Sequence, residues 1–141
     1  MSDPHDLQRF LDAQSSIYEQ VCGELRTGRK RSHWMWFIFP QIAGLGHSET
    51  ARFYAIRSLD EAAAFLEHPT LGPRLLECTN LISQIPGKTI HDILGSPDNM
   101  KFRSCMTLFA HATTDNKPFE DALQKYFGGE HDPLTLERLR G

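Results

Sequence analysis

The chain has 141 residues, of which 40% are hydrophobic and 23% charged, with a formal net charge of −3 and a pI near 6.1. This length suits one domain, expected over residues 1–141, and the acidic balance excludes a general nucleic-acid binder, which would carry an excess of Lys and Arg. No apolar run approaches the roughly 20 residues of a membrane span, and the N-terminus lacks a signal-peptide pattern, so we expect a cytoplasmic protein without membrane contact.

A long amphipathic helix is predicted near the N-terminus. Asp3-Pro4 supplies an N-cap and a first-turn proline, and apolar residues recur at helical spacing from Leu7 to Leu25. The pattern ends at Thr27-Gly28, with glycine at the expected C-terminal cap. Arg29-Lys30-Arg31 follows, and these cations fit either a solvated helix end or a clamp for a phosphate or carboxylate.

The segment Ser32–Gln41, with the sequence SHWMWFIFPQ, holds both tryptophans of the chain. Each large side chain contributes roughly 1.5–3 kcal/mol when fully buried, so we expect the segment in the core. A buried strand would need a partner that the remaining sequence does not offer, which favours a short buried helix or turn. Gly44-Leu45-Gly46 follows, and because glycines let a ligand approach the backbone, we expect a pocket here.

Capping residues and prolines divide the rest of the chain into short helices. Ser58 opens an S-x-x-E capping box, and a short helix is predicted from Thr89 to Leu94. The other expected starts and stops are Ser48, His68-Pro69, Leu71-Gly72-Pro73, Pro86-Gly87, Ser96-Pro97-Asp98, Lys117-Pro118, Gly128-Gly129 and Asp132-Pro133. The sequence therefore predicts an all-α fold, a compact single-domain array of seven or eight short helices around the buried aromatic segment.

The helix expected from Ser96 to His111 carries two kinds of side chain. Its apolar face repeats at i, i+3, i+4 and i+7, through Phe102, Cys105, Met106 and Phe109. Beside that face lie Lys101, Arg103, Ser104 and Thr107. These groups either point hydrogen-bond donors into a cleft or form a solvated face whose hydroxyls bond back to the helix.

Common catalytic and nucleotide-binding motifs are absent, including H-E-x-x-H, G-x-x-x-x-G-K-[ST], G-x-S-x-G and G-x-G-x-x-G. The seven histidines form no i, i+4 pair, so we expect neither a metal nor a cofactor. Cys22, Cys78 and Cys105 have no C-x-x-C spacing and fall inside helical patterns, which favours reduced, buried thiols.

Two histidines near the ends of the aromatic segment are the best candidates for acid–base chemistry. His33 precedes Trp34 and His47 precedes Ser48, although a structural hydrogen-bonding role is the alternative for each. Glu49 is the carboxylate close to this segment; it serves as a general base if it turns inward, and surface exposure is the alternative.

Several segments resemble a bacterial family called "domain of unknown function 1810". The resemblance is carried by SHWMWFIFPQ, Gly44-Leu45-Gly46, Tyr54-Ala55-Ile56, Leu71-Gly72-Pro73-Arg74-Leu75, Pro97-Asp98 with Lys101, and Ser104 with Met106-Thr107-Leu108-Phe109. It extends from Leu7 to Leu139 and implies an all-α single domain, but no activity; some members carry the label calpastatin.

A more distant likeness is to the helical NADAR family, which resembles an ADP-ribose-handling N-glycosidase fold. It is carried by Ser48-Glu49 before a helix with Tyr54 and by Lys101-Phe102, whereas the late Trp-Gly-Asp segment of that family is missing. The likeness implies catalytic roles for Glu49 and Lys101.

We therefore predict a pocket for a small phosphate-bearing ligand, such as a nucleotide or an ADP-ribose derivative, with the aromatic segment as its floor. The predicted ligand-binding residues are Lys30, Trp36, Gln41, Ser48, Tyr54, Lys101, Arg103, Ser104 and Thr107. If the protein is an enzyme, glycosidic cleavage with His33, His47 or Glu49 as acid–base groups is the first hypothesis. The alternative is a non-catalytic interaction domain that docks an acidic partner on Arg29-Lys30-Arg31, and the oligomeric state stays open.

Overall fold

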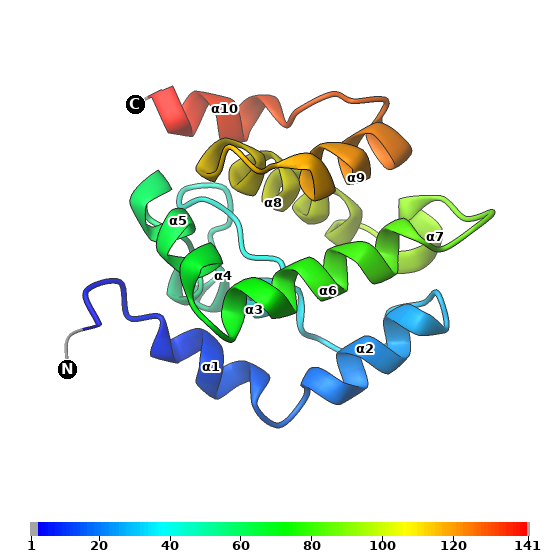
Figure 1. Ribbon diagram of the computed structural model, residues 1–141, viewed down its shortest axis with the longest axis horizontal. Helices are drawn as coiled ribbons and strands as arrows, with labels where there is room; N and C mark the ends of the chain where they lie inside the picture. Colours follow the sequence, from blue (N-terminus) through cyan, green and yellow to red (C-terminus); the bar gives the residue numbers. More distant parts are fainter. Residues whose placement is uncertain (1–2, 141) are drawn as a thin grey trace.

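Ten helices form the part of the chain described by the computed structural model, residues 3–140 (Figure 1). Residues 1, 2 and 141 of the expected domain lie outside the described range. The helices are α1 (Gln8–Gln14), α2 (Tyr18–Arg26), α3 (Met35–Ile38), α4 (Glu49–Phe53), α5 (Leu59–Glu67), α6 (Leu71–Ser83), α7 (Ile90–Leu94), α8 (Asp98–Ala112), α9 (Lys117–Phe127) and α10 (Pro133–Arg140). The all-α fold is confirmed, and the only bridge found within residues 3–140 is an isolated one between Ile42 and Ile56.

The predicted long first helix is wrong, because the chain bends between α1 and α2. The N–H of Ile17 bonds to Gln14 O at 3.1 Å, which tightens the backbone into a turn. Ser15 also donates its hydroxyl to Asp12 O, a local bond that competes with helix continuation. The Asp3 carboxylate accepts the N–H groups of Leu7 and Gln8, so it caps α1 from several residues away. Such breaks raise the number of helices above the seven or eight expected.

The aromatic segment forms α3, a short helix in the core. Trp34, Met35, Ile38 and Phe39 are buried, as expected, whereas Trp36 and Phe37 are only half-buried. Phe39 meets Phe102 of α8 edge to face, with ring centroids 5.0 Å apart, a favourable arrangement for two aromatic rings. The segment thus ties the first half of the chain to α8.

Helix α8 is the most enclosed element, and all residues from Ser104 to Ala110 are buried. It contacts α5, α7, α9 and α10. In Figure 1, α9 and α10 lie along one edge of the molecule and α1 and α2 along the opposite edge. The three cysteines are free and buried, and burial raises the pKa of the Cys105 thiol well above its ordinary value. Their predicted role as small buried side chains is confirmed.

Replacing Gly72 with alanine is expected to lower the free energy of unfolding by about 1–3 kcal/mol, the usual cost of overpacking a core. A Cβ there would overlap the Leu66 carbonyl oxygen, where the end of α5 meets the start of α6. Gly23→Ala in α2 is the matched control, because its added Cβ meets no atom within 4 Å. In urea denaturation the free energy of unfolding should fall for Gly72→Ala and rise by about 0.5–1 kcal/mol for Gly23→Ala. Equal changes in the two variants would contradict the close approach of Gly72 to the Leu66 carbonyl oxygen.

Candidate functional site

The cations after α2 are positioned by a glycine-terminated helix end. Gly28 has a φ of +79°, its N–H bonds to Leu25 O, and the N–H of Arg29 bonds to Glu24 O. This pair of bonds is the Schellman motif, which satisfies the last carbonyls of α2 and reverses the chain. The predicted glycine cap is confirmed, and it directs Arg29 and Lys30 toward α7.

Glu24 then fixes the conformation of the turn after Gly28. Its buried carboxylate accepts hydrogen bonds from the backbone N–H groups of Arg31 and Ser32, at 2.7 and 3.0 Å. It also accepts bonds from the Ser32 hydroxyl, the Gln20 amide and the indole of Trp34. Burial by itself would raise the pKa of Glu24, but these hydrogen bonds outweigh it and lower the pKa from 4.5 to about 2.

Helix α7 forms the other wall of the site. The N–H of Lys30 bonds to Ile93 O at 2.7 Å, and the Lys88 ammonium bonds to Gly28 O at 3.0 Å. Between these segments lies a cavity of about 500 Å³, which we call the cationic pocket. It is lined by Arg29, Lys30, Lys88, His91 and Asp92 together with residues 93–95.

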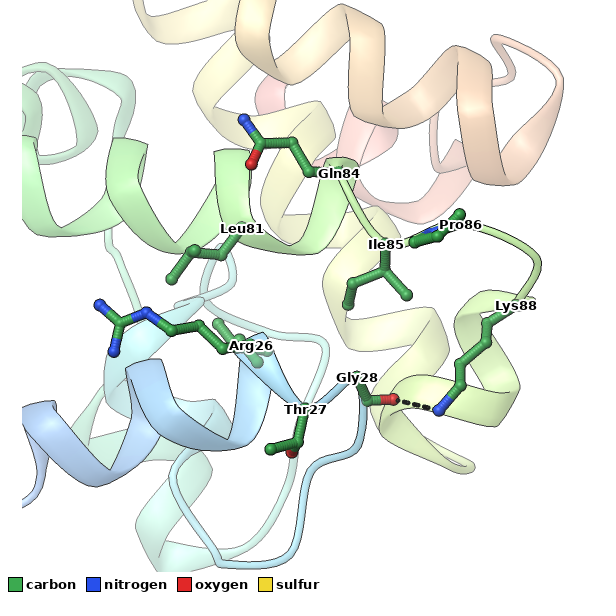
Figure 2. A pocket seen from close by; sticks show the side chains of 9 residues that line it. Arg26, Thr27, Gly28, Leu81, Gln84, Ile85, Pro86 and Lys88 are labelled. Carbon is green, nitrogen blue, oxygen red and sulfur yellow. Dashed lines mark hydrogen bonds between the residues drawn. The ribbon is translucent and has the colours of Figure 1, made fainter.

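A second cavity, of about 370 Å³, lies between the C-terminal ends of α2 and α6 (Figure 2). We call it the neighbouring pocket, because Lys88 lines both cavities. Its apolar lining consists of Leu25, Leu81, Ile85 and Pro86. The remaining lining residues are Arg26, Thr27, Gly28, Gln84 and Lys88. Figure 2 shows Arg26 and Lys88 at different ends of this pocket.

The corner formed by these two pockets concentrates positive charge on an acidic protein. Arg26, Arg29, Lys30 and Lys88 line these pockets and Arg31 follows directly in the sequence; they are five of the 15 Lys and Arg residues of a chain with net charge −3. Asp92 is the carboxylate of the cationic pocket, and it accepts the N–H of Thr89 in a capping box at the start of α7. Lys30 is paired with Asp98 at 2.9 Å, whereas Arg29 has no ion-pair partner within residues 3–140. The corner therefore retains cations able to attract an anion.

The structure brings the aromatic segment and the start of α8 together, as the sequence predicted. Asp98 pairs with Lys30 at 2.9 Å and lies 3.6 Å from Lys101. The Lys101 ammonium lies 5.2 Å from the ring centroid of Trp36, within the range of a cation–π interaction. Both lysines are thus partly neutralised by one carboxylate, which lowers their attraction for an added anion.

The other predicted donors of α8 bond to the segment before α10. Arg103 donates to the carbonyl oxygens of Glu130 and His131, and Ser104 donates to the Asp132 carboxylate at 3.1 Å. Thr107 accepts the N–H of Asp132 at 2.8 Å. The structure therefore does not join these three side chains to the aromatic segment in one cavity; they hold α10 in place.

The predicted residues around the glycine loop lie apart from the cationic pocket. Gln41, Trp36 and Tyr54 border a space of only about 10 Å³, room for at most one water molecule. His47 borders a larger cavity, about 710 Å³, between Gly44-Leu45 and α10. His33, Ser48 and Glu49 are exposed, and Ser48 caps α4 through the N–H of Ala51.

Lys88 and His91 are candidate site residues that the sequence did not indicate. They come about sixty positions after Arg29, and only the packing of α7 against the end of α2 brings them together. A lysine after Pro86-Gly87 resembles an ordinary loop residue, so no local pattern marks it. In residues 3–140, no three His, Cys, Asp or Glu side chains form a metal-binding group.

The fold and these surfaces define a compact all-α protein with a cationic pocket between α2 and α7. The chain belongs to the DUF1810 family, proteins of unknown function, whose model matches residues 4–139. Its structure is similar to the crystal structure of the conserved hypothetical protein Rv1873 from Mycobacterium tuberculosis, with a TM-score of 0.98 and 53% identity over 99% of both chains. No curated protein gives a significant match. No helix within residues 3–140 is long and apolar enough to span a bilayer.

Proposed function

We propose that this protein binds a small phosphate-bearing molecule in the cationic pocket. The observation that supports this most directly is the convergence of Arg29 and Lys88, together with Lys30, His91 and one lining carboxylate, Asp92, around a cavity of about 500 Å³. Small-molecule sites typically enclose about 300–1,000 Å³ and fix their ligands with a few converging polar groups. The proposal retains the ligand class predicted from the sequence, but it moves the site from the aromatic segment to the corner between α2 and α7.

The chemistry of the lining residues favours phosphate. Arg29 offers a planar fork of N–H donors that matches phosphate oxygens, and the Lys88 ammonium has two N–H groups beyond the one that bonds to Gly28 O. Both side chains are exposed, so binding does not require opening of the core. The Glu24 bonds to the Arg31 and Ser32 backbone keep this turn ordered before binding.

Exchange of both Arg29 and Lys88 for glutamine is expected to weaken phosphate binding at least about tenfold, because charge-assisted hydrogen bonds are worth roughly 1.5–3 kcal/mol each. Isothermal titration with inorganic phosphate at low ionic strength measures the loss. The matched control is Arg52→Gln combined with Lys117→Gln, which removes the same charge from exposed positions on α4 and α9. Equal weakening by both double variants would contradict a specific site.

The alternative is an acidic protein partner that docks on Arg29-Lys30-Arg31, whose arginines are both exposed. A protein partner would contact the rim of the pocket. Arg31→Gln should then weaken binding of the partner as much as Lys88→Gln does. Phosphate binding predicts a larger effect for Lys88, since Arg31 does not line the pocket. Glycosidic cleavage by His33, His47 or Glu49 stays a prediction, and we assign no reaction to the cationic pocket.

A further inference from the structure

We infer that the ligand is an organic phosphate whose apolar part occupies the neighbouring pocket while its phosphate lies in the cationic pocket. This inference rests on the proposed phosphate site and adds the chemical class of the molecule that carries the phosphate.

The two cavities have one lining residue in common, Lys88. This residue lines both, and the consecutive residues Gly28 and Arg29 line one each. The bond from the Lys88 ammonium to Gly28 O, drawn as the dashed line in Figure 2, therefore lies between the two sets of lining residues. A ligand that spans both sets places its charged group beside the ammonium and the rest of its structure against α2 and α6.

The linings divide the charge and the apolar surface between the two sides. The cationic pocket has Arg29, Lys30, Lys88, His91 and one carboxylate, Asp92. The neighbouring pocket is lined by apolar side chains, of which Leu81 and Pro86 are accessible and Leu25 and Ile85 are buried. Water is displaced favourably from such apolar walls by a ring or a short hydrocarbon group. Inorganic phosphate alone would leave these walls in water, so an ester with an apolar body fits the whole site better.

Side chains at the rim suit a planar body such as an aromatic ring or a nucleobase. Arg26 is exposed at the far end of the neighbouring pocket, and its guanidinium can stack on a ring. Gln84 is exposed beside Ile85 and carries an amide that both donates and accepts hydrogen bonds. These two groups favour a ring over a long alkyl chain.

Calorimetric titration with inorganic phosphate, phenyl phosphate, adenosine monophosphate and adenosine tests the inference. Phenyl phosphate, the nucleotide, or both should bind at least about tenfold more tightly than inorganic phosphate, and adenosine should bind more weakly than the nucleotide. Leu81→Gln makes an apolar wall polar at a partly exposed position, so the fold should tolerate it, which its thermal midpoint checks. Leu81→Gln should bind the organic phosphates no more tightly than inorganic phosphate. Its affinity for inorganic phosphate should equal that of the parent protein.

The results separate this inference from the proposed function. If inorganic phosphate binds but neither ester binds more tightly, the cationic pocket stands and the inference about the neighbouring pocket is overturned. The same follows if Leu81→Gln leaves the preference for the esters unchanged. If inorganic phosphate and the esters all fail to bind, both proposals fall. A preference for the nucleotide over phenyl phosphate would identify a nucleobase as the apolar part.

Discussion

Replacement of Arg9 by methionine should lower the free energy of unfolding by about 3–5 kcal/mol, the usual effect of leaving one member of a buried ion pair unpaired. Arg9 and Glu61 form such a pair at 2.7 Å, with side chains only 2% and 1% exposed. Arg9 also donates to the carbonyl oxygens of Phe53 and Ala55, which flank the end of α4. Methionine cannot satisfy these acceptors, so several buried polar groups would lose their partner together.

The matched control for Arg9→Met is Arg52→Met, because Arg52 is an exposed arginine on α4. Surface substitutions of this kind usually change stability by less than about 0.5 kcal/mol. Urea denaturation followed by the fluorescence of Trp34 and Trp36 measures both variants. A loss below about 1 kcal/mol for Arg9→Met would show that this pair does not hold α1 against the segment between α4 and α5.

Glu24→Ala should also lower the free energy of unfolding by about 3–5 kcal/mol. Five donors converge on the buried Glu24 carboxylate and would be left without their acceptor. The turn from Arg29 to Ser32 would lose its anchor, so phosphate affinity should fall as well. Glu19→Ala is the control, since Glu19 is an exposed carboxylate in the first turn of the same helix. Glu19→Ala should lower the free energy of unfolding by less than about 1 kcal/mol, the contribution of one favourable charge at a helix end.

The pH dependence of the Glu24 effect follows from its lowered pKa. The folded protein holds the pKa near 2, below the ordinary value of 4.5, so the ionised group stabilises the folded state. This contribution is fully present above about pH 5 and is lost as the pH falls from 4.5 toward 2. The stability difference between the parent protein and Glu24→Ala should therefore shrink over that interval. A difference that stays constant from pH 6 to pH 3 would contradict the hydrogen-bonded carboxylate.

Local signals made much of the fold predictable. Three helix ends lie where the sequence indicated them, because each depends on residues only a few positions away. They are marked by Gly28 after α2, Ser58 before α5 and Asp132 before α10. Burial of the aromatic segment was also predictable, because its large apolar side chains have few other favourable places in a small protein. The sequence did not reveal the bend between α1 and α2, because the helical spacing of apolar residues is kept on both sides of Ser15-Ser16.

The site was less predictable because it depends on partners distant in the sequence. The sequence marks Arg29 and Lys30 as adjacent cations, but Lys88 joins them only through the packing of α7. Arg103 and Thr107 were correctly placed on α8, yet their hydrogen bonds run to residues 130–132, which no periodicity connects with them. Glu24 resembles a surface carboxylate of an amphipathic helix, and only the fold shows that the chain turns back over it.

Amide chemical shifts recorded during a phosphate titration show whether phosphate binds between α2 and α7. Binding there predicts saturable changes concentrated at residues 28–31 and 88–95, with little change at residues 44–49. Saturable changes concentrated instead around Gly44 to Glu49, or a phosphate response spread over all exposed cations without saturation, would contradict it.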